Sequence, residues 1–309
     1  MHKLRRFIYQ NKYQILGVLG IIVFIFIIIQ LMNLWAKRSN EDVLANRGQN
    51  TITVNETNPG VISNKSAVTG NEVSKSQLDD ETGAINKFWE YCNNQDFENA
   101  YNMLTDECKK QMYSNVDAFK NSYYKNVFGG EKKNCTIENW VNDTYRVNIT
   151  GDVLATGKVD EYSKQDYITV EQVDGEYKLN INNFIGYSEI NKKTTENNIT
   201  IEVVSKSTYK DYEEYTIIAT NNTESIIQLA NISNTECLYL KDSKGVKYPY
   251  YNHELTTPMI TVSSGQDKEI TIKFYSSFVS TKKIQSIVFS NIILKNGELG
   301  ENLEFTANI

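Results

Sequence analysis

The hydrophobic positions change their spacing along the chain, and each spacing predicts a different kind of segment. Residues 15–36 are almost wholly apolar and are interrupted only by Gln30 and Asn33. A helix of about 22 residues rises ~33 Å, which is enough to cross the hydrocarbon core of a bilayer. This first segment is therefore predicted to be a transmembrane helix.

The charges around the apolar segment predict its orientation. Four lysines and arginines lie in residues 1–14, whereas the two that follow the segment are soon joined by carboxylates. The positive-inside rule then places residues 1–14 in the cytoplasm and everything after Arg38 outside the cell membrane. A cleaved signal peptide is a weaker interpretation, because the apolar run is longer than an ordinary signal core and the small residues Val43 and Ala45 lie too far downstream.

Residues 37–83 are rich in Asn, Ser, Thr, Gly and Glu, and their few apolar residues follow no period. Such a composition is typical of a disordered linker. A flexible chain of about 45 residues has a typical reach of ~35–40 Å, so the predicted linker would hold the folded part away from the membrane.

A helical period appears at the start of the next segment, residues 84–187. The apolar positions spaced at i, i+3, i+4 and i+7 are Ile85, Phe88, Trp89 and Cys92, followed by Phe97, Ala100, Tyr101 and Leu104. They predict a hairpin of two amphipathic helices. Asp106 can cap a short third helix, and Ser114 begins a fourth that ends at Gly129-Gly130.

The period then shortens to two, which indicates strands. The segments with this alternation are Cys135–Trp140, Tyr145–Leu154, Tyr167–Gln172 and Tyr177–Ile181. Asp174-Gly175 between the last two predicts a tight hairpin turn. Helices followed by an antiparallel meander predict an α+β domain over residues 84–187.

The remaining residues, 188–309, are predicted to form an all-β sandwich. Tyr187–Asn198 is polar and is predicted to be a joint between the two domains. Beyond it, short alternating runs such as 215–220 and 270–275 are separated by turns of Asn, Gly, Ser and Asp. Many short strands spaced in this way favour two packed antiparallel sheets.

Two family resemblances refine this fold class. FWEYCNNQDFENAYNMLTDECKK, VDAFKNSYYKNVF and DYITVEQVDGEYKLNI together resemble the NTF2-like cone fold, in particular the membrane-tethered extracytoplasmic versions of Gram-positive bacteria. ATNNTESIIQLANIS and VSSGQDKEITIKF resemble the immunoglobulin-like modules of bacterial surface proteins, although the Cys and Trp core of antibody domains is missing. The resemblances imply an α+β NTF2-like cone domain and an all-β immunoglobulin-like sandwich behind one N-terminal transmembrane helix.

The composition argues against several kinds of site. The net charge of −6 disfavours nucleic-acid binding, because no long cationic surface is available to displace the counterions of phosphates. Cys92, Cys108, Cys135 and Cys237 have neither CxxC spacing nor neighbouring histidines, so no metal site is expected. We interpret them as small buried hydrophobic residues, with one disulfide among the first three as the alternative. No cofactor is expected, because the known phosphate-binding motifs are absent.

Four aromatic residues, Trp89, Tyr101, Tyr123 and Trp140, are candidates for lining a ligand cavity inside the cone domain. By resemblance, enzymes of the NTF2-like superfamily use histidine, aspartate and tyrosine in that cavity, but residues 84–187 contain no histidine. We therefore expect that the protein is not an enzyme. The competing interpretation of these aromatic residues is that they form the inner faces of the helices.

A second candidate lies in the sandwich domain, where Tyr248, Tyr250, Tyr251 and His253 occur within one short loop. Tyrosines supply rigid amphipathic contact area, so this loop is a candidate for recognising a protein or a glycan. A single histidine does not by itself supply a metal site or a catalytic triad. The alternative is that the rings merely cover one end of the sandwich.

Together these features predict a single-pass, membrane-anchored extracytoplasmic protein that binds or scaffolds in the bacterial cell envelope without catalysis. Its partner would be an envelope protein or a cell-wall glycan. One alternative is a structural component of a conjugation or secretion complex, in which Gln30 and Asn33 would contact other membrane helices. A second alternative is a small-ligand sensor that uses the NTF2-like cavity.

Overall fold

The computed structural model describes residues 65–151, 164–295 and 303–309. The predicted cytoplasmic tail, the predicted transmembrane helix and most of the predicted linker lie outside the described residues. None of the helices within the described ranges is long and apolar enough to cross a membrane. All the described residues belong to one compact unit.

The first regular element is a long helix that begins inside the segment predicted to be a linker. Helix α3 spans Lys75–Asn93, and the Ser74 side chain caps it by accepting a hydrogen bond from the Gln77 backbone N–H at 3.2 Å. The buried stripe of α3 extends back to Leu78. The linker prediction is therefore wrong from Lys75 onward, because a capping serine and a buried leucine extend the helix beyond its periodic part.

Further short helical elements follow α3. They are α4 (Phe97–Asn102), α5 (Asp106–Met112), α6 (Val116–Phe119) and α7 (Lys125–Val127), with one π-helical turn, Lys120–Tyr124, between the last two. The hairpin predicted from the apolar spacing is confirmed by α3 and α4. The caps of α5 and α6 are the side chains of Thr105 and Asn115 rather than the predicted Asp106 and Ser114.

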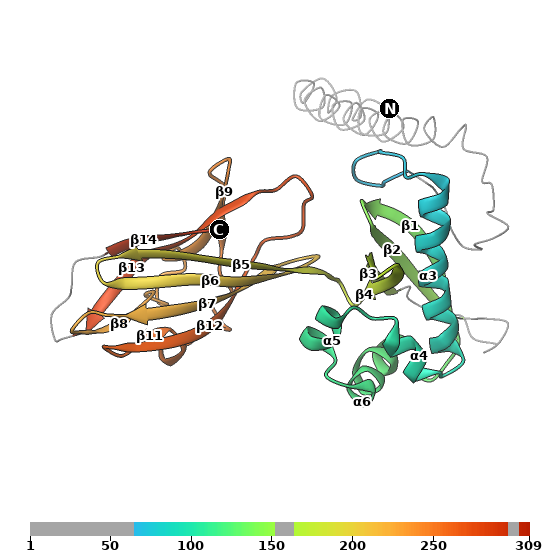
Figure 1. Ribbon diagram of the computed structural model, residues 1–309, viewed down its shortest axis with the longest axis horizontal. Helices are drawn as coiled ribbons and strands as arrows, with labels where there is room; N and C mark the ends of the chain where they lie inside the picture. Colours follow the sequence, from blue (N-terminus) through green and yellow to red (C-terminus); the bar gives the residue numbers. More distant parts are fainter. Residues whose placement is uncertain (1–64, 152–163, 296–302) are drawn as a thin grey trace, which may run out of the picture. The chain divides into compact units, whose positions relative to one another are not determined.

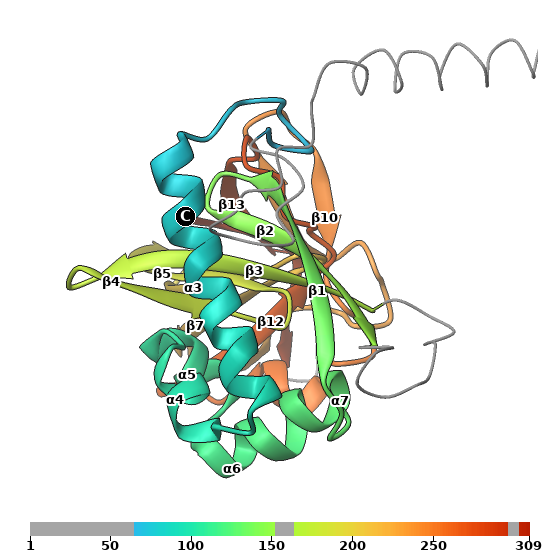
Figure 2. The same cartoon turned by 90° about the vertical axis from the view of Figure 1, so that its right-hand side faces the viewer.

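A four-stranded antiparallel sheet completes this α+β part. Its strands are β1 (Lys133–Val141), β2 (Thr144–Gly151), β3 (Lys164–Val173) and β4 (Glu176–Asn180), hydrogen-bonded in that order. The turn between β3 and β4 has Asp174 at φ 53° and Gly175 at φ 84°, which confirms the hairpin predicted there. Helix α3 lies along one face of this sheet and contacts β3 and β4 (Figure 1, Figure 2).

The residues from Phe184 onward form two further antiparallel sheets. One has the order β12-β7-β6-β5, with β5 at Phe184–Glu196, β6 at Ile199–Tyr209, β7 at Glu213–Asn221 and β12 at Gln266–Phe274. The other has the order β10-β9-β13-β8-β11, with β14 also paired to β13. Its strands are β8 (Ile226–Gln228), β9 (Leu238–Asp242), β10 (Lys247–Pro249), β11 (Thr261–Val262), β13 (Ile284–Lys295) and β14 (Leu303–Asn308). Two antiparallel sheets are compatible with the predicted sandwich.

The polar joint predicted at Tyr187–Asn198 is wrong, because most of it belongs to β5. This strand pairs with β6 along its length, and Asn197 and Asn198, both at positive φ, make the turn between them. Strand β5 ends the hydrogen-bonded order of its sheet, so its side chains can be polar without disrupting the strand. The predicted domain boundary between residues 187 and 188 therefore falls inside one strand.

The buried apolar residues form two clusters. The first joins α3 to the four-stranded sheet and includes Phe88, Phe119 and Ile168. The second lies among the strands of the two later sheets and includes Ile217 and Phe289. All five side chains have no exposed surface, and burying a side chain of this size contributes ~1.5–3 kcal/mol. The apolar spacing of the sequence is therefore explained by two separate cores.

One ion pair is buried in the all-β part of the chain. Lys282, between β12 and β13, lies 3.6 Å from the carboxylate of Glu213 in β7, and both side chains are almost completely buried. Ser276 donates its hydroxyl to the same carboxylate at 2.9 Å, and the Lys282 ammonium donates to the Ser276 Oγ at 2.5 Å. Desolvation lowers the pKa of Lys282, while the charge of Glu213 opposes that decrease.

Removing one partner of this ion pair is expected to lower the unfolding free energy more than removing both partners. The substitution Lys282→Met leaves Glu213 buried without its cation, and we expect a loss of about 3–5 kcal/mol of unfolding free energy. The double substitution Lys282→Met with Glu213→Leu should recover most of that loss. Chemical denaturation followed by tyrosine fluorescence measures both values.

The exposed pair of Lys65 and Glu72, 3.3 Å apart, supplies the control. The substitution Lys65→Met should change the unfolding free energy by less than ~1 kcal/mol. If the double variant were as unstable as Lys282→Met alone, the unpaired carboxylate would not be the cause of the loss.

Candidate functional site

Three of the aromatic residues predicted to line a cavity lie together in the first core. The ring of Tyr123 is centred 6.0 Å from that of Phe88, and Phe88 also contacts Trp89 at 6.3 Å. The ring of Tyr101 lies 6.3 Å from that of Phe119, which stacks on Tyr123 at 5.7 Å. These three predicted residues are therefore packed ring against ring, and none of them lines the polar pocket or the open groove that are described next.

The fourth predicted residue, Trp140, lies elsewhere. In β1, the buried Ile137 and Asn139 alternate with Glu138 and Trp140, so Trp140 turns to the other face of the sheet, next to the bulge that precedes Val141. There its ring packs against Tyr167 at 4.6 Å and against Phe278 at 5.7 Å. The structure therefore does not bring Trp140 together with Trp89, Tyr101 and Tyr123.

Tyr123 has a polar partner within the first core. Its hydroxyl donates to Asp166 at 2.8 Å, and the same carboxylate accepts the backbone N–H groups of Asn182 at 3.1 Å and Asn183 at 2.9 Å. Burial raises the pKa of Asp166, and these hydrogen bonds oppose the increase. Burial also raises the pKa of Tyr123 well above its ordinary value. The pair therefore holds the segment after β4 in place, and the tyrosine keeps its proton.

All four cysteines are free, and Cys92, Cys108 and Cys237 are buried. Burial raises the pKa of Cys108 and that of Cys135 to about 12 in each case. A thiol with such a pKa stays protonated at neutral pH, so it is a poor nucleophile and a poor metal ligand. The interpretation as buried hydrophobic residues is confirmed for the three buried cysteines.

A polar pocket of about 490 Å³ lies beside α3. The residues that line it are Gln77, Glu81, Asp143, Val170, Glu171, Gln172 and Tyr177. Glu81 accepts hydrogen bonds from the Tyr145 hydroxyl at 2.5 Å and from the Gln77 amide at 2.8 Å. Burial raises the pKa of Glu81, and the nearby Asp143 and Asp80 add to the increase. Within the described residues, no group of three or more histidine, cysteine and carboxylate side chains could hold a metal ion.

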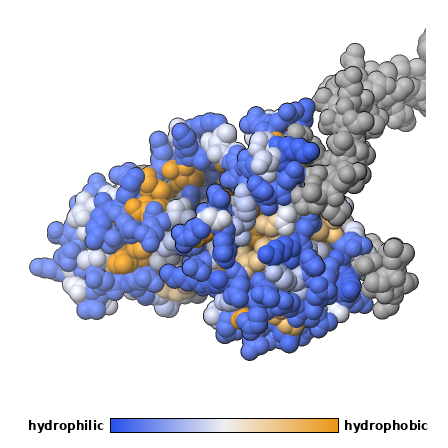
Figure 3. Space-filling model, turned by 45° about the vertical axis from the view of Figure 1, so that its right-hand side comes forward, coloured by the Kyte–Doolittle hydropathy of each residue, from blue (hydrophilic) through white to orange (hydrophobic). Residues whose placement is uncertain are grey.

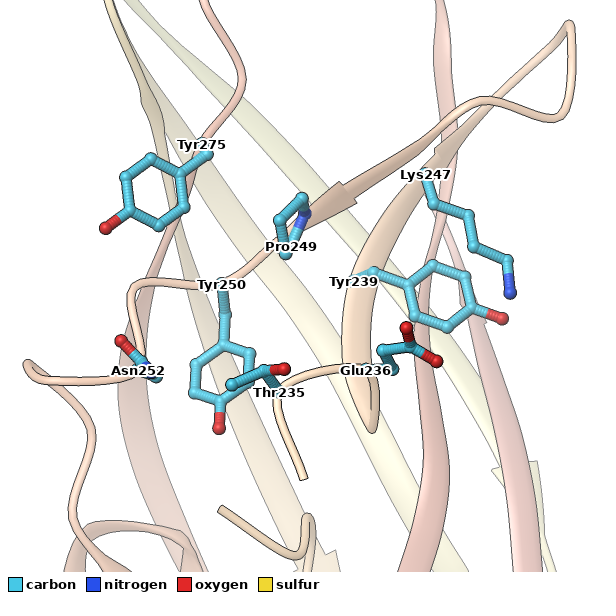
Figure 4. A pocket seen from close by; sticks show the side chains of 8 residues that line it. All are labelled: Thr235, Glu236, Tyr239, Lys247, Pro249, Tyr250, Asn252 and Tyr275. Carbon is cyan, nitrogen blue, oxygen red and sulfur yellow. The ribbon is translucent and has the colours of Figure 1, made fainter. Parts of the chain in front are cut away.

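An open groove lies in the all-β part of the chain (Figure 4). It has a volume of about 490 Å³ and is lined by Thr235, Glu236, Tyr239, Lys247, Pro249, Tyr250, Asn252 and Tyr275. We call these eight residues the tyrosine groove. Strand β9 supplies Tyr239, β10 supplies Lys247 and Pro249, and Tyr275 directly follows β12. Segments that are distant in sequence therefore meet at this groove.

The four residues of the predicted recognition loop have different positions relative to the groove. Tyr250 lines it directly. Tyr251 stacks on Tyr275 with centroids 3.6 Å apart and planes 16° apart, and the Nε2 atom of His253 lies 3.3 Å from the Tyr275 hydroxyl. Tyr248 instead donates to Asp242 at 3.0 Å. The loop thus contributes one lining residue and two residues that support Tyr275.

The sequence prediction missed most of the lining residues. Tyr239, Glu236 and Lys247 are brought to the groove by the pairing of β9 with β10 and by the turn before β9. The sequence could have indicated Tyr275, because this large aromatic residue follows β12 directly and falls on the polar side of its alternating pattern. It is 43% exposed.

Apolar surface alone does not single out another site. The face shown in Figure 3 is mostly hydrophilic, and its apolar side chains gather in small separate areas. The exposed large hydrophobic residues within the described part of the chain are Val68, Val173, Ile226, Val246, Met259, Tyr275 and Val279. Of these, Tyr275 is the one that lines a described pocket.

The raised pKa of Glu81 predicts a pH dependence of stability. Because the folded chain binds this proton more tightly than the unfolded chain, the contribution of Glu81 to stability should fall as pH rises from its ordinary pKa of 4.5. Over that window, Glu81→Gln should gain stability relative to the wild type. Unfolding free energies measured from pH 4.5 to neutral test this sign.

Glu176 supplies a control of opposite sign. Its hydrogen bond and ion pair with Lys178 lower its pKa, so its contribution should be present from pH 4.5 upward and lost as pH falls below 4.5 through that lowered pKa, a range to which the measurement is extended. A Glu81→Gln variant whose stability tracked the wild type at every pH would contradict the assigned burial effect.

No family model matches the chain, and no curated protein or solved structure matches it either. The resemblances to the NTF2-like fold and to immunoglobulin-like modules therefore stay predictions.

Proposed function

We propose that the chain is a single-pass, membrane-anchored protein that binds or scaffolds a component of the bacterial cell envelope without catalysis. Residues 15–36 would be the anchor, and an NTF2-like α+β domain followed by an immunoglobulin-like sandwich would lie outside the membrane. The observation that carries the binding role is the tyrosine groove. It combines aromatic rings with polar side chains in one open depression.

The polar members of the groove support this role because they are free to bind. Within the described residues, the side chains of Thr235, Glu236 and Asn252 have no hydrogen bond or ion pair to the protein, and all three are exposed. Their donors and acceptors are therefore available to a ligand. Aromatic residues next to such groups are typical of contact sites that contribute most of the binding energy.

The packing of the α+β part favours this proposal over a small-ligand sensor. A sensor would need an empty space among Trp89, Tyr101 and Tyr123, whereas these rings contact Phe88 and Phe119 directly. The polar pocket beside α3 is a weaker candidate for a ligand site, because Glu81, one of its carboxylates, already accepts hydrogen bonds from Tyr145 and Gln77.

The proposed topology predicts protease accessibility. A tag fused to Ile309 should be cleaved by protease added to intact protoplasts, whereas a tag fused to Met1 should be protected until the membrane is opened. Immunoblotting of both fusions measures the two outcomes. Protection of the C-terminal tag in intact protoplasts would contradict the proposed localisation.

The groove predicts a loss of envelope binding in one variant. Full-length chain in phospholipid nanodiscs should co-sediment with a cell-envelope fraction, and Tyr275→Ala should weaken that binding about tenfold or more. The matched control is Val279→Ala, because Val279 is 51% exposed and does not line the groove. Equal binding by the two variants would exclude the groove as the binding site.

A further inference from the structure

The chemistry of the tyrosine groove narrows the kind of ligand that it fits. We propose that the groove binds a short, neutral oligosaccharide of N-acetylated amino sugars, an inference that rests on the binding role proposed above.

Tyr275 is a fixed platform. One side of its ring stacks on Tyr251 at 3.6 Å, and its hydroxyl lies 3.3 Å from the Nε2 atom of His253. The residue nevertheless remains 43% exposed and lines the groove. A ring that is held in this way loses little conformational entropy on binding, and it offers an apolar surface to the C–H face of a sugar ring.

A second ring stands at the other end of the groove. Figure 4 shows Tyr239 and Tyr275 on opposite sides, with Pro249 and Tyr250 between them. The ammonium of Lys247 lies 4.4 Å from the centroid of Tyr239, so it covers one face of that ring. Two separated rings fit a ligand of more than one unit, and a volume of about 490 Å³ lies within the ordinary range of small-ligand sites.

The polar side chains that line the groove with these rings match hydroxyl and acetamido groups. Thr235 supplies a hydroxyl, Glu236 a carboxylate and Asn252 an amide, and none of the three has a partner within the described part of the protein. Sugar hydroxyls donate and accept, so they can satisfy all three kinds of group. The planar acetamido group adds an amide for Asn252 and a methyl group for an aromatic surface.

Other ligand classes fit these residues less well. A purely apolar ligand would remove water from Glu236 and Asn252 without replacing their hydrogen bonds, which costs binding free energy. A polyanion such as a nucleic acid or a phosphate polymer would meet the Glu236 carboxylate and a chain of net charge −6. A neutral sugar avoids both penalties.

The test uses full-length chain in phospholipid nanodiscs, so that no sugar-based detergent competes. Triacetylchitotriose is titrated by isothermal calorimetry, with cellotriose as the matched sugar without acetamido groups. We expect the chitotriose to bind and cellotriose to bind several-fold more weakly. The substitution Tyr275→Ala should weaken chitotriose binding about tenfold, whereas Tyr275→Phe should keep most of it because the ring remains.

Val279→Ala is the control variant and should bind chitotriose as the wild type does. Equal affinity for chitotriose and cellotriose would overturn the acetamido assignment, and unchanged affinity in Tyr275→Ala would overturn the site. Chitotriose is also added to the envelope-binding assay as a competitor. If it neither binds nor competes while envelope binding still depends on Tyr275, the sugar inference is overturned and the proposed binding role stands. If a proline-rich peptide competes for envelope binding and the sugar does not, the sugar inference is likewise overturned and the binding role stands. Envelope binding that does not depend on Tyr275 would remove the proposed role as well.

Discussion

A continuous column of aromatic rings fixes the exposed tyrosine of the groove. Phe184 contacts Tyr209 at 5.3 Å, Tyr209 stacks on Tyr212 at 4.3 Å, Tyr212 contacts Tyr251 at 6.1 Å, and Tyr251 stacks on Tyr275 at 3.6 Å. Phe184 has no exposed surface, so the column starts in a packed core and ends at solvent. Each ring limits the rotation of the next, and Tyr275 therefore gains order that an isolated surface side chain would lack.

Local periodicity predicted the elements better than their ends. The alternation in 215–220 and 270–275 is confirmed by β7 and β12, because these strands bury one face against a core. The start of α3 and the course of β5 escaped prediction for a common reason. Both are polar segments whose regular structure depends on partners elsewhere, through a capping side chain at Ser74 and through pairing with β6. Composition alone made each of them look like a linker.

The site was predictable only where one loop supplied its residues. Tyr250, Tyr251 and His253 are neighbours in sequence, so their common use could be proposed from the chain alone. Tyr239 and Tyr275 are joined to them by strand pairing and by the path of the chain after β12, which a single sequence does not specify. Strand parity could have separated Trp140 from the predicted cavity, because Trp140 is three residues from Ile137, which belongs to the first core, and therefore falls on the opposite face.

A cation braces the aromatic column beside the groove. Lys273 lies 4.0 Å above the ring of Tyr212 and 4.9 Å from that of Tyr251, and its ion pair with Glu254 spans 3.3 Å, so a cation braces the column beside the groove. Ordering one long side chain on binding costs ~0.5–1.5 kcal/mol, and a braced ring avoids part of that cost. An open groove leaves part of a ligand in water, so it gains binding free energy from fewer contacts than an enclosed cavity does. Such a site therefore depends on its rings being in place before the ligand arrives, which is what the column provides.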